Sequence, residues 1–191
     1  MFIYRKQLIY FMSNPKEIIN VSAELLTSFT EVTLDNVTHV EDFRNREFSI
    51  LFRSFLKDGQ IGLYAWINNS VVGHAWAIIC RGSHYCANGY MDIYNTEAFI
   101  YFCNVSEKYR GLNIYPTMLS IICHKLFSQG KVSRIIIDTE YNNSTSQHGI
   151  AKVGFKLGGR GTYIQINQRL IIKYFVAFNY ELTPRIRNGR K

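Results

Sequence analysis

A turn rich in backbone donors carries the residues of this sequence that could do the most chemistry. It runs from Asn104 to Tyr115 (NVSEKYRGLNIY) and joins a predicted strand to a predicted helix. The unpaired N–H groups at a helix N-terminus, with their partial positive charge, bind phosphate without a dedicated side chain. The turn therefore predicts a site for a phosphorylated ligand.

The segments on either side of this turn must position it. Residues 97–105 (EAFIYFCNV) predict a strand, and the period of two puts alternate side chains on one face: Glu97, Phe99, Tyr101, Cys103 and Val105. Apolar residues at helical spacing then predict a helix over 114–128. We expect Asn113 to cap that helix and Gly130 to end it.

The remaining elements predict a mixed sheet with helices on its faces. Residues 38–57 predict one or two helices, residues 61–67 and 71–80 predict a hairpin, and residues 82–95 predict a loop. Further along, residues 134–140 predict a strand, and residues 144–153 predict a helix that begins with a capping box from Ser144 to Gln147. The residues after Gly158-Gly159 predict a last strand. The first forty residues stay open: 2–12 could be a strand, and 24–34 a strand or a helix. The β-α-β-α-β order after an antiparallel hairpin indicates an α/β fold.

Length and charge narrow the class of protein. With 191 residues, 47% of them hydrophobic, the chain suits a single domain over 1–191. The net charge of +8 favours anionic partners, among them nucleotides, phosphorylated cofactors, nucleic acid and an acidic membrane surface. Part of the excess lies in residues 184–191, which we expect to be a flexible basic tail.

Cysteine spacing and hydropathy exclude several kinds of site. Cys80, Cys86, Cys103 and Cys123 form no CxxC pair, so neither a zinc site nor a disulfide framework is predicted. No segment approaches the roughly 20 apolar residues of a membrane span. The N-terminal apolar run, 8–12, is too short for a secretory signal, and we expect a cytoplasmic protein.

Three segments resemble motifs of the GNAT family of N-acetyltransferases, in the family's order and spacing. Val105 to Tyr115 resembles its pyrophosphate-binding motif Q/R-x-x-G-x-G/A, with Arg110 at the Q/R position. Asn143, Ser146, Lys152 and Gly154-Phe155 resemble the downstream N-x-x-[AS]…K-x-G-F pattern. Asp58 to Trp76 resembles the family's central hairpin, so the matches cover about 58–166.

The resemblance implies a fold, a co-substrate and an activity. The fold would be the GNAT-like acyl-CoA N-acyltransferase fold, a mixed, mostly antiparallel sheet flanked by helices. The co-substrate would be acetyl-CoA, without a metal, and the reaction would transfer its acetyl group to an amine. The residues that would contact acetyl-CoA are Cys103, Asn104, Val105, Arg110, Gly111, Leu112, Asn113, Ile114, Tyr115, Asn143 and Ser146. Asn143 could instead cap the last helix, since asparagine is a favoured cap.

The sequence departs from the family pattern at three positions. Asn113 and Tyr115 replace small residues of the pyrophosphate motif, although asparagine tolerates the left-handed turn that glycine would give. The pattern Arg110-Gly111-x-x-Ile114-Tyr115 resembles the variant of this motif found in amino-sugar N-acetyltransferases of surface-polysaccharide pathways. The family's frequent tyrosine, which protonates the departing thiolate of CoA, would fall at Ile150, which has no proton to donate.

The resemblance leaves the catalytic groups to be assigned among several residues. Glu97 is the candidate base that deprotonates the amine, and His74, with its pKa near neutrality, is the alternative. Ser146, His148 and Tyr141 are candidate acids in place of the missing tyrosine. Cys103 has no basic neighbour and is read as a buried structural cysteine. The backbone of residues 103–105 would hold the thioester oxygen.

The acceptor is the least determined part of the function. We expect a primary amine of a small molecule, with a nucleotide-linked amino sugar as one class. A peptide or protein amine, or a catalytically silent CoA-binding module, are the alternatives. A homodimer is compatible with the resemblance, whereas a nucleic-acid partner has only the basic tail in its favour.

Overall fold

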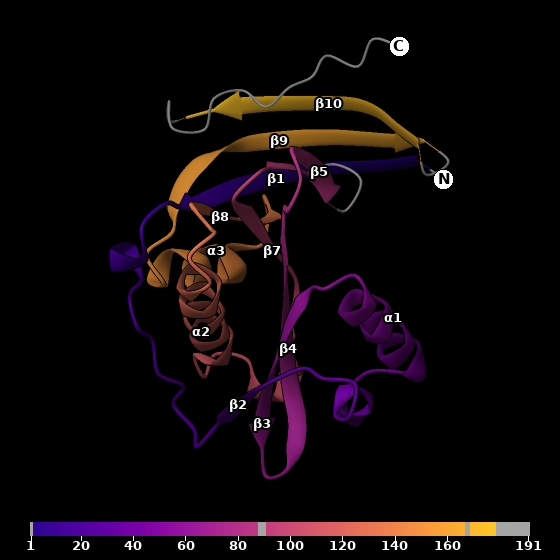
Figure 1. Ribbon diagram of the computed structural model, residues 1–191, viewed down its shortest axis with the longest axis vertical. Helices are drawn as coiled ribbons and strands as arrows, with labels where there is room; N and C mark the ends of the chain where they lie inside the picture. The colour runs from indigo at the N-terminus through magenta and orange to yellow at the C-terminus, as the bar shows by residue number, and fades with distance from the viewer. Residues whose placement is uncertain (1, 88–90, 167–168, 179–191) are drawn as a thin grey trace.

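The computed structural model describes residues 2–87, 91–166 and 169–178 (Figure 1). Within these residues eight strands form one sheet in the order β10-β9-β1-β8-β7-β4-β3-β2. Its strands are β1 (Phe2–Met12), β2 (Ser28–Glu31), β3 (Ile61–Ile67), β4 (Ser70–Ile79), β7 (Glu97–Val105), β8 (Arg134–Glu140), β9 (Lys156–Ile166) and β10 (Arg169–Ala177). β7 and β8 pair in parallel, and the other neighbours pair antiparallel. The expected mixed, mostly antiparallel sheet is confirmed.

Helices cover both faces of this sheet. They are α1 (Arg46–Lys57), α2 (Ile114–Ser128) and α3 (Ser144–Lys152), with short 3₁₀ turns η1 (Pro15–Glu17), η2 (Val37–Asp42) and η3 (Glu107–Tyr109). Figure 1 shows α2 and α3 on one side of the strands and α1 on the other. In the described part of the chain, no helix combines the length and the apolar character needed to cross a membrane.

Three clusters of buried side chains hold the layers together. Under α2, Met118, Leu119 and Ile122 pack with sheet residues that include Ile100 and Ile137. The aromatic cluster under α1 contains Phe52, Tyr64 and Trp76. A third cluster, which we call the β1–β8 cluster, lies on the side away from α2 and joins Ile9, Phe11, Phe99 and Ile136 to the hairpin β5 (His84–Ala87) and β6 (Met91–Tyr94).

The two parallel strands at the centre of the sheet, β7 and β8, are paired over only part of their length. β7 pairs with β8 from Glu97 opposite Arg134 to Ile100 opposite Ile137. Beyond that point β7 continues beside β4 as far as Val105, and β8 continues beside β1 as far as Glu140. Each strand keeps its outer neighbour, so the two open into a cleft.

A β-bulge in β7 marks the same place. His74 faces Asn104 and Trp76 faces Tyr101, so one residue of β4 opposes two residues of β7, Phe102 and Cys103. Phe102 has φ +52°, unusual for a bulky residue, and its carbonyl oxygen accepts a hydrogen bond from His74 Nδ1 at 2.8 Å. The bulge re-aims the side chains that follow it.

The face assignment predicted for 97–105 is therefore wrong beyond Tyr101. Phe99 and Tyr101 do lie on one face, against the β1–β8 cluster. Cys103 and Val105 pack instead with the residues under α2. The extra residue of the bulge shifts the period of two by one step, which reverses every later side chain.

Most of the predicted elements are present, with one correction among them. The strands over 97–105 and 134–140 and the helix over 114–128 have the predicted bounds, and the helix predicted over 144–153 ends at Lys152. The segment 82–95, predicted as a loop, contains the β5–β6 hairpin, because Ala87, Met91 and Ile93 are apolar enough to be buried. The tail at 184–191 lies outside the described residues.

The first forty residues, which the sequence leaves open, supply two strands. β1 lies between β8 and β9, so the N-terminal segment is a central strand of the sheet. β2 pairs with β3 at the other end of the sheet. Gly158-Gly159, expected to precede a strand, lies inside β9.

His74 gives the fold a predicted sensitivity to acid. Burial lowers the pKa of His74 to about 3, whereas the ordinary value is 6.5. The folded protein therefore excludes a proton that the unfolded chain takes up. The contribution of His74 to the free energy of unfolding is therefore fully present above pH 6.5. It falls by at most about 1.4 kcal/mol per pH unit as the pH decreases from 6.5 towards 3.

We expect the difference in unfolding free energy between wild type and His74→Gln to shrink as the pH falls from 7 to 4. Urea unfolding at several pH values measures both proteins, and the other titrating groups cancel in the difference. A difference that does not change with pH would show that His74 takes up its proton equally well in the folded state.

Candidate active site

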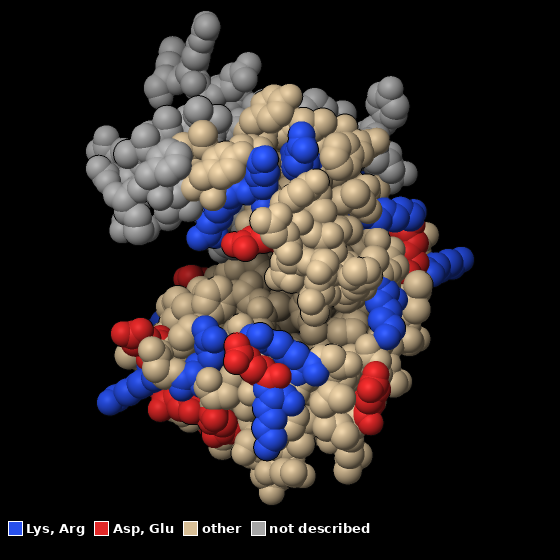
Figure 2. Space-filling view, turned by 180° about the vertical axis from the view of Figure 1, so that it is seen from behind, with Lys and Arg blue, Asp and Glu red and all other residues tan. Residues whose placement is uncertain are grey.

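The opening between β7 and β8 forms a cavity of about 630 Å³. It is lined by residues 100–105 of β7, residues 137–140 of β8, Arg5 and Gln7 of β1, Arg110, Tyr115, Asn143, Thr145 and Ser146. In the space-filling view the molecule is hollowed between the half that carries β1, β9 and β10 and the half that carries α1 (Figure 2). Cavity residues thus come from three strands, from the turn before α2 and from the start of α3.

A smaller cavity of about 220 Å³ adjoins the first at the N-terminus of α2. It is lined by Val105, Tyr109, Arg110, Gly111, Asn113, Ile114, Tyr115 and Pro116 and, from α3, by Thr145, His148, Gly149 and Lys152. We call it the phosphate cradle. Val105, Arg110, Tyr115 and Thr145 line both cavities, so a ligand could extend from one into the other.

The turn that forms the cradle has the backbone shape expected from its sequence. Gly111 has φ +82° and Asn113 has φ +58°, so asparagine takes the left-handed conformation that glycine would give. The side chain of Asn113 does not cap α2, however, and that expectation is wrong. Its Oδ1 accepts from Lys152 Nζ at 2.7 Å, and its Nδ2 donates to Glu24 Oε1 at 2.8 Å.

Two cations border the cradle. The Arg110 side chain is half exposed, and its Nε donates to the carbonyl oxygen of Val105 at 3.2 Å. Lys152 is held to Asn113 across the cradle, from the last turn of α3. Backbone donors at a helix N-terminus with two cations beside them suit a phosphate-bearing ligand.

Tyr115 reaches the junction of the two cavities. Its hydroxyl oxygen lies 3.2 Å from Ser146 Oγ. A Cβ at position 149 would lie 2.7 Å from Cδ1 of the Tyr115 ring, so Gly149 is what lets α3 pack this closely against the ring. Burial raises the pKa of the Tyr115 phenol well above its ordinary value, so it stays protonated at working pH.

The position where the family has its tyrosine lies elsewhere in the structure. Ile150 is 0% exposed and packs in the core under α2. Among the three acids suggested by the sequence, Ser146 lines the larger cavity and His148 lines only the cradle. Tyr141 is an exposed residue that lines neither cavity. A phenol is thus present at the site, but it comes from α2 instead of α3.

Asn143 caps α3. Its Oδ1 accepts the backbone N–H of Ser146 at 3.0 Å. The predicted capping box, which had Ser144 as the cap, is therefore one residue out of place, since the cap is Asn143 and Ser144 opens the helix. Asn143 also lines the larger cavity, so capping and a ligand contact are both open to it.

The structure does not bring Glu97 to the cleft. Glu97 is 5% exposed, lies 3.4 Å from Arg134 and accepts the backbone N–H of Tyr94 at 2.9 Å. It begins β7 at the paired end, and six residues separate it from Cys103, about 20 Å along a strand. Glu97 therefore lies at the end of β7 that does not line the cleft.

His74 and Cys103 are also constrained by burial. The His74 ring lies among Phe43, Phe48 and Phe52 under α1, and its low pKa makes it a weak base. Cys103 lines the cleft, but burial raises the pKa of its thiol to about 12. The reading of Cys103 as a structural cysteine fits that environment.

The cleft is also lined by polar residues that the sequence-based site does not include, among them Arg5, Gln7 and Asp138. Arg5 and Gln7 come from β1, whose position between β8 and β9 the local pattern does not reveal. Asp138 is the first residue of β8 after its last pair with β7. Its one signal in the sequence is that it interrupts the apolar run Ile135-Ile136-Ile137.

Comparisons with known proteins agree with this geometry. The family model for the acetyltransferase (GNAT) family matches residues 24–155. A search of curated protein sequences finds no significant match.

Solved structures with a similar fold include GNAT acetyltransferases. One from Colwellia psychrerythraea has a TM-score of 0.60 at 17% identity, over 82% of this chain and 54% of that chain. A putative acetyltransferase from Novosphingobium aromaticivorans has a TM-score of 0.59 at 9% identity, over 84% and 63%. The aminoglycoside N-acetyltransferase AAC(6')-Iy, in complex with CoA, has a TM-score of 0.53 at 18% identity, over 68% and 91%.

At these low sequence identities the similarity to the solved structures is one of fold alone. The chain spans about half the length of the Colwellia protein. The family match is of a different kind, because it covers residues 24–155, more than half of the sequence. This range includes the cradle and all of the cleft residues except Arg5 and Gln7. The chain therefore belongs to the acetyltransferase (GNAT) family.

Proposed function

We propose that the protein is an acetyl-CoA-dependent N-acetyltransferase that acetylates a primary amine of a small molecule by direct attack on the thioester. The observation that carries this proposal is the continuity of the two cavities, because the phosphate cradle opens into the cleft between β7 and β8. An elongated ligand with a phosphate end and an amide-containing arm fits that shape.

The residues present suit CoA at both ends of the site. The N-terminus of α2, Arg110 and Lys152 would hold the pyrophosphate. Beyond Ile100 the structure pairs no residue of β7 with β8, so the inner edge of β7 is open to the amides of the pantetheine arm. The backbone of residues 103–105 would then stabilise the negative charge that develops on the thioester oxygen.

Tyr115 and Ser146 supply the proton that the departing thiolate needs. Their oxygens lie 3.2 Å apart at the inner end of the cradle, and both residues line the cleft. The raised pKa of Tyr115 keeps the phenol in the form that can donate. Tyr115 would thus serve in place of the tyrosine that Ile150 replaces.

A small amine, with a nucleotide-linked amino sugar as the first class to screen, is the acceptor we propose. The net charge of +8 favours an anionic carrier such as a nucleotide. AAC(6')-Iy, an aminoglycoside N-acetyltransferase by its name, shares the fold, which puts amino sugars among the amines worth testing. A peptide or protein amine is the other acceptor class for the same assay.

Acetyl-CoA should raise the melting temperature of the protein. A ligand at 100 times its Kd stabilises the folded state by about 2.7 kcal/mol, or roughly 5 to 10 °C for a domain of this size. Lys152→Met should weaken the shift because it removes a cation of the cradle. Lys125→Met is the matched control, since Lys125 also lies on the surface in an ion pair, with Glu31, away from the cradle.

Release of free CoA with a panel of amines then tests the transfer. The panel should include nucleotide amino sugars, simple amino sugars and peptides with free N-termini. No thermal shift with acetyl-CoA would remove the proposed function. A shift without CoA release from any amine would instead indicate a catalytically silent CoA-binding module.

The role of Tyr115 makes a separate prediction. Tyr115→Phe removes only the hydroxyl, so we expect kcat to fall about tenfold or more while the thermal shift with acetyl-CoA is kept. Gly149→Ala should displace the Tyr115 ring, because the new Cβ would lie 2.7 Å from the ring atom Cδ1. We therefore expect it to lower both kcat and the thermal shift with acetyl-CoA.

The same clash can be tested by a double-mutant cycle. In a Tyr115→Ala background the ring is absent, and Gly149→Ala should then stabilise the protein by up to about 1 kcal/mol through helix propensity. If Gly149→Ala costs the same stability in both backgrounds, the ring contact does not explain the glycine.

A further inference from the structure

The cleft has a second face, opposite the phosphate cradle. Paired residues of antiparallel strands project to the same side, and Ile9 faces Asp138 while Phe11 faces Ile136. Ile9, Phe11 and Ile136 belong to the β1–β8 cluster, which lies on the side away from α2. Asp138 therefore projects to the side opposite α2.

Asp138 stands where the two strands part. It follows Ile137, the last residue of β8 that pairs with β7, and it lines the cleft. Burial is the main cause of the raised pKa of Cys103 and of Tyr115, and the negative charge of Asp138 raises the pKa of both groups further. A carboxylate thus lines the same cavity as residues 103–105 and Tyr115, from the opposite side of the sheet.

Gln7 supplies an acceptor atom beside it. Gln7 faces Glu140 across the strand pair and so lies diagonal to Asp138 on the same side of the sheet. It is 4% exposed, and its Oε1 is buried without a hydrogen-bond partner among the described residues. A buried carbonyl oxygen in a cavity wall has a free-energy cost that an N–H donor from a ligand would remove.

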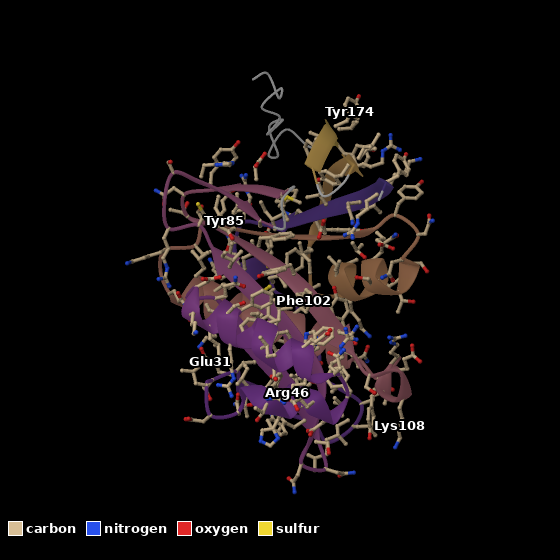
Figure 3. All side chains as sticks on the ribbon, turned by 90° about the vertical axis from the view of Figure 1, so that its right-hand side faces the viewer. Glu31, Arg46, Tyr85, Phe102, Lys108 and Tyr174 are labelled. Atoms are coloured by element: carbon tan, nitrogen blue, oxygen red, sulfur yellow. The ribbon has the colours of Figure 1, made fainter. Side chains whose placement is uncertain are left out.

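Aromatic rings complete this face. Tyr101 lines the cleft, stacks on Phe99 and is fixed by the hydrogen bond of its hydroxyl to Gln60. Phe102, 38% exposed, lies near the centre of the view in Figure 3 and packs against Phe48, Phe52 and Phe55 of α1. Aromatic faces attract cations, so they suit the approach of an ammonium group.

We propose that Asp138 and Gln7 bind the acceptor as its ammonium ion, and that Asp138 takes the proton that frees the nitrogen for attack. The inference rests on the acetyltransferase activity proposed above. It assigns the base to β8, in place of Glu97 on β7, and brings the amine in from the side of α1 while acetyl-CoA lies on the side of α2.

The transfer then balances as follows. One proton passes from the ammonium nitrogen to the Asp138 carboxylate. The nitrogen lone pair forms the C–N bond at the thioester carbon, and the C–S bond breaks with its electron pair on sulfur. The Tyr115 and Ser146 pair gives one proton to the thiolate, and the second nitrogen proton replaces it on that pair. Asp138 returns the first proton to solvent, which is the one net proton released. The products are the amide and CoA.

Two CoA thioethers test the ammonium site without any need to know the acceptor. S-(2-aminoethyl)-CoA places an ammonium near the position of the attacking nitrogen, and S-propyl-CoA is its neutral counterpart. Wild type should bind the aminoethyl compound roughly tenfold or more tightly than the propyl compound, as expected for a charge-assisted hydrogen bond. Isothermal titration calorimetry measures both affinities.

Asp138→Asn should abolish this preference and leave the affinity for S-propyl-CoA unchanged, which also shows that the variant is folded. Gln7→Met should reduce the preference in part. Glu97→Gln is the competing variant and should keep the full preference. All three variants keep the other charged and titratable groups of the cleft, which are Arg5, Tyr101, Cys103, Arg110, Tyr115 and Glu140.

Each outcome decides between the two proposals. If neither thioether binds, the acetyl-CoA assignment itself fails, and with it the ammonium site. If both bind equally well to wild type, the cofactor assignment stands and the ammonium site is overturned. Loss of the preference in Glu97→Gln but not in Asp138→Asn would return the base to β7.

Discussion

Two parallel strands that stop pairing halfway along are the constraint on which the rest of the site depends. β7 stays beside β4, and β8 stays beside β1, so each keeps one paired edge while the inner edges open after Ile100 and Ile137. The bulge at Phe102 lets β7 lean away without losing its bonds to β4, and His74 fixes the bulge by donating to the Phe102 carbonyl oxygen. Polar backbone at the opening is then available to a ligand without unfolding any part of the sheet.

The opening gives the two faces of the sheet different chemistry. The face under α2 and α3 carries helix N-terminal donors, Arg110 and Lys152, so it is suited to phosphate. The opposite face carries Asp138, aromatic rings and the Oε1 of Gln7, which has no hydrogen-bond partner among the described residues. These groups suit an ammonium group, although Arg5 lies two residues before Gln7 on the same strand face. The phosphate end of acetyl-CoA and the ammonium group of an acceptor would therefore bind to different groups on opposite faces, without competing for them.

Local patterns predicted the central β-α-β unit because each of its elements has a clear period. They could not predict the bulge, since a period of two assumes an unbroken strand, and Phe102 carries no glycine-like signal for its positive φ. Asp138 was missed for a related reason: the end at which β7 and β8 separate depends on β1 and β4, which come from distant parts of the chain. Glu97 matched a spacing along one strand, but spacing does not say which end of that strand opens.

Tyr115 shows how a departure from a motif can be consistent with the same function. A tyrosine in the phosphate turn would be expected to crowd the site, because a close approach of backbone to phosphate favours small residues. Here the ring turns away from the turn and packs against Gly149 of α3, and the hydroxyl emerges beside Ser146. The family's position for a phenol, Ile150, is apolar and fully buried, so a second phenol there would have no cavity to enter. In the proposed mechanism, Tyr115 on α2 would supply the proton that Ile150 on α3 cannot, and Gly149 leaves room for the Tyr115 ring.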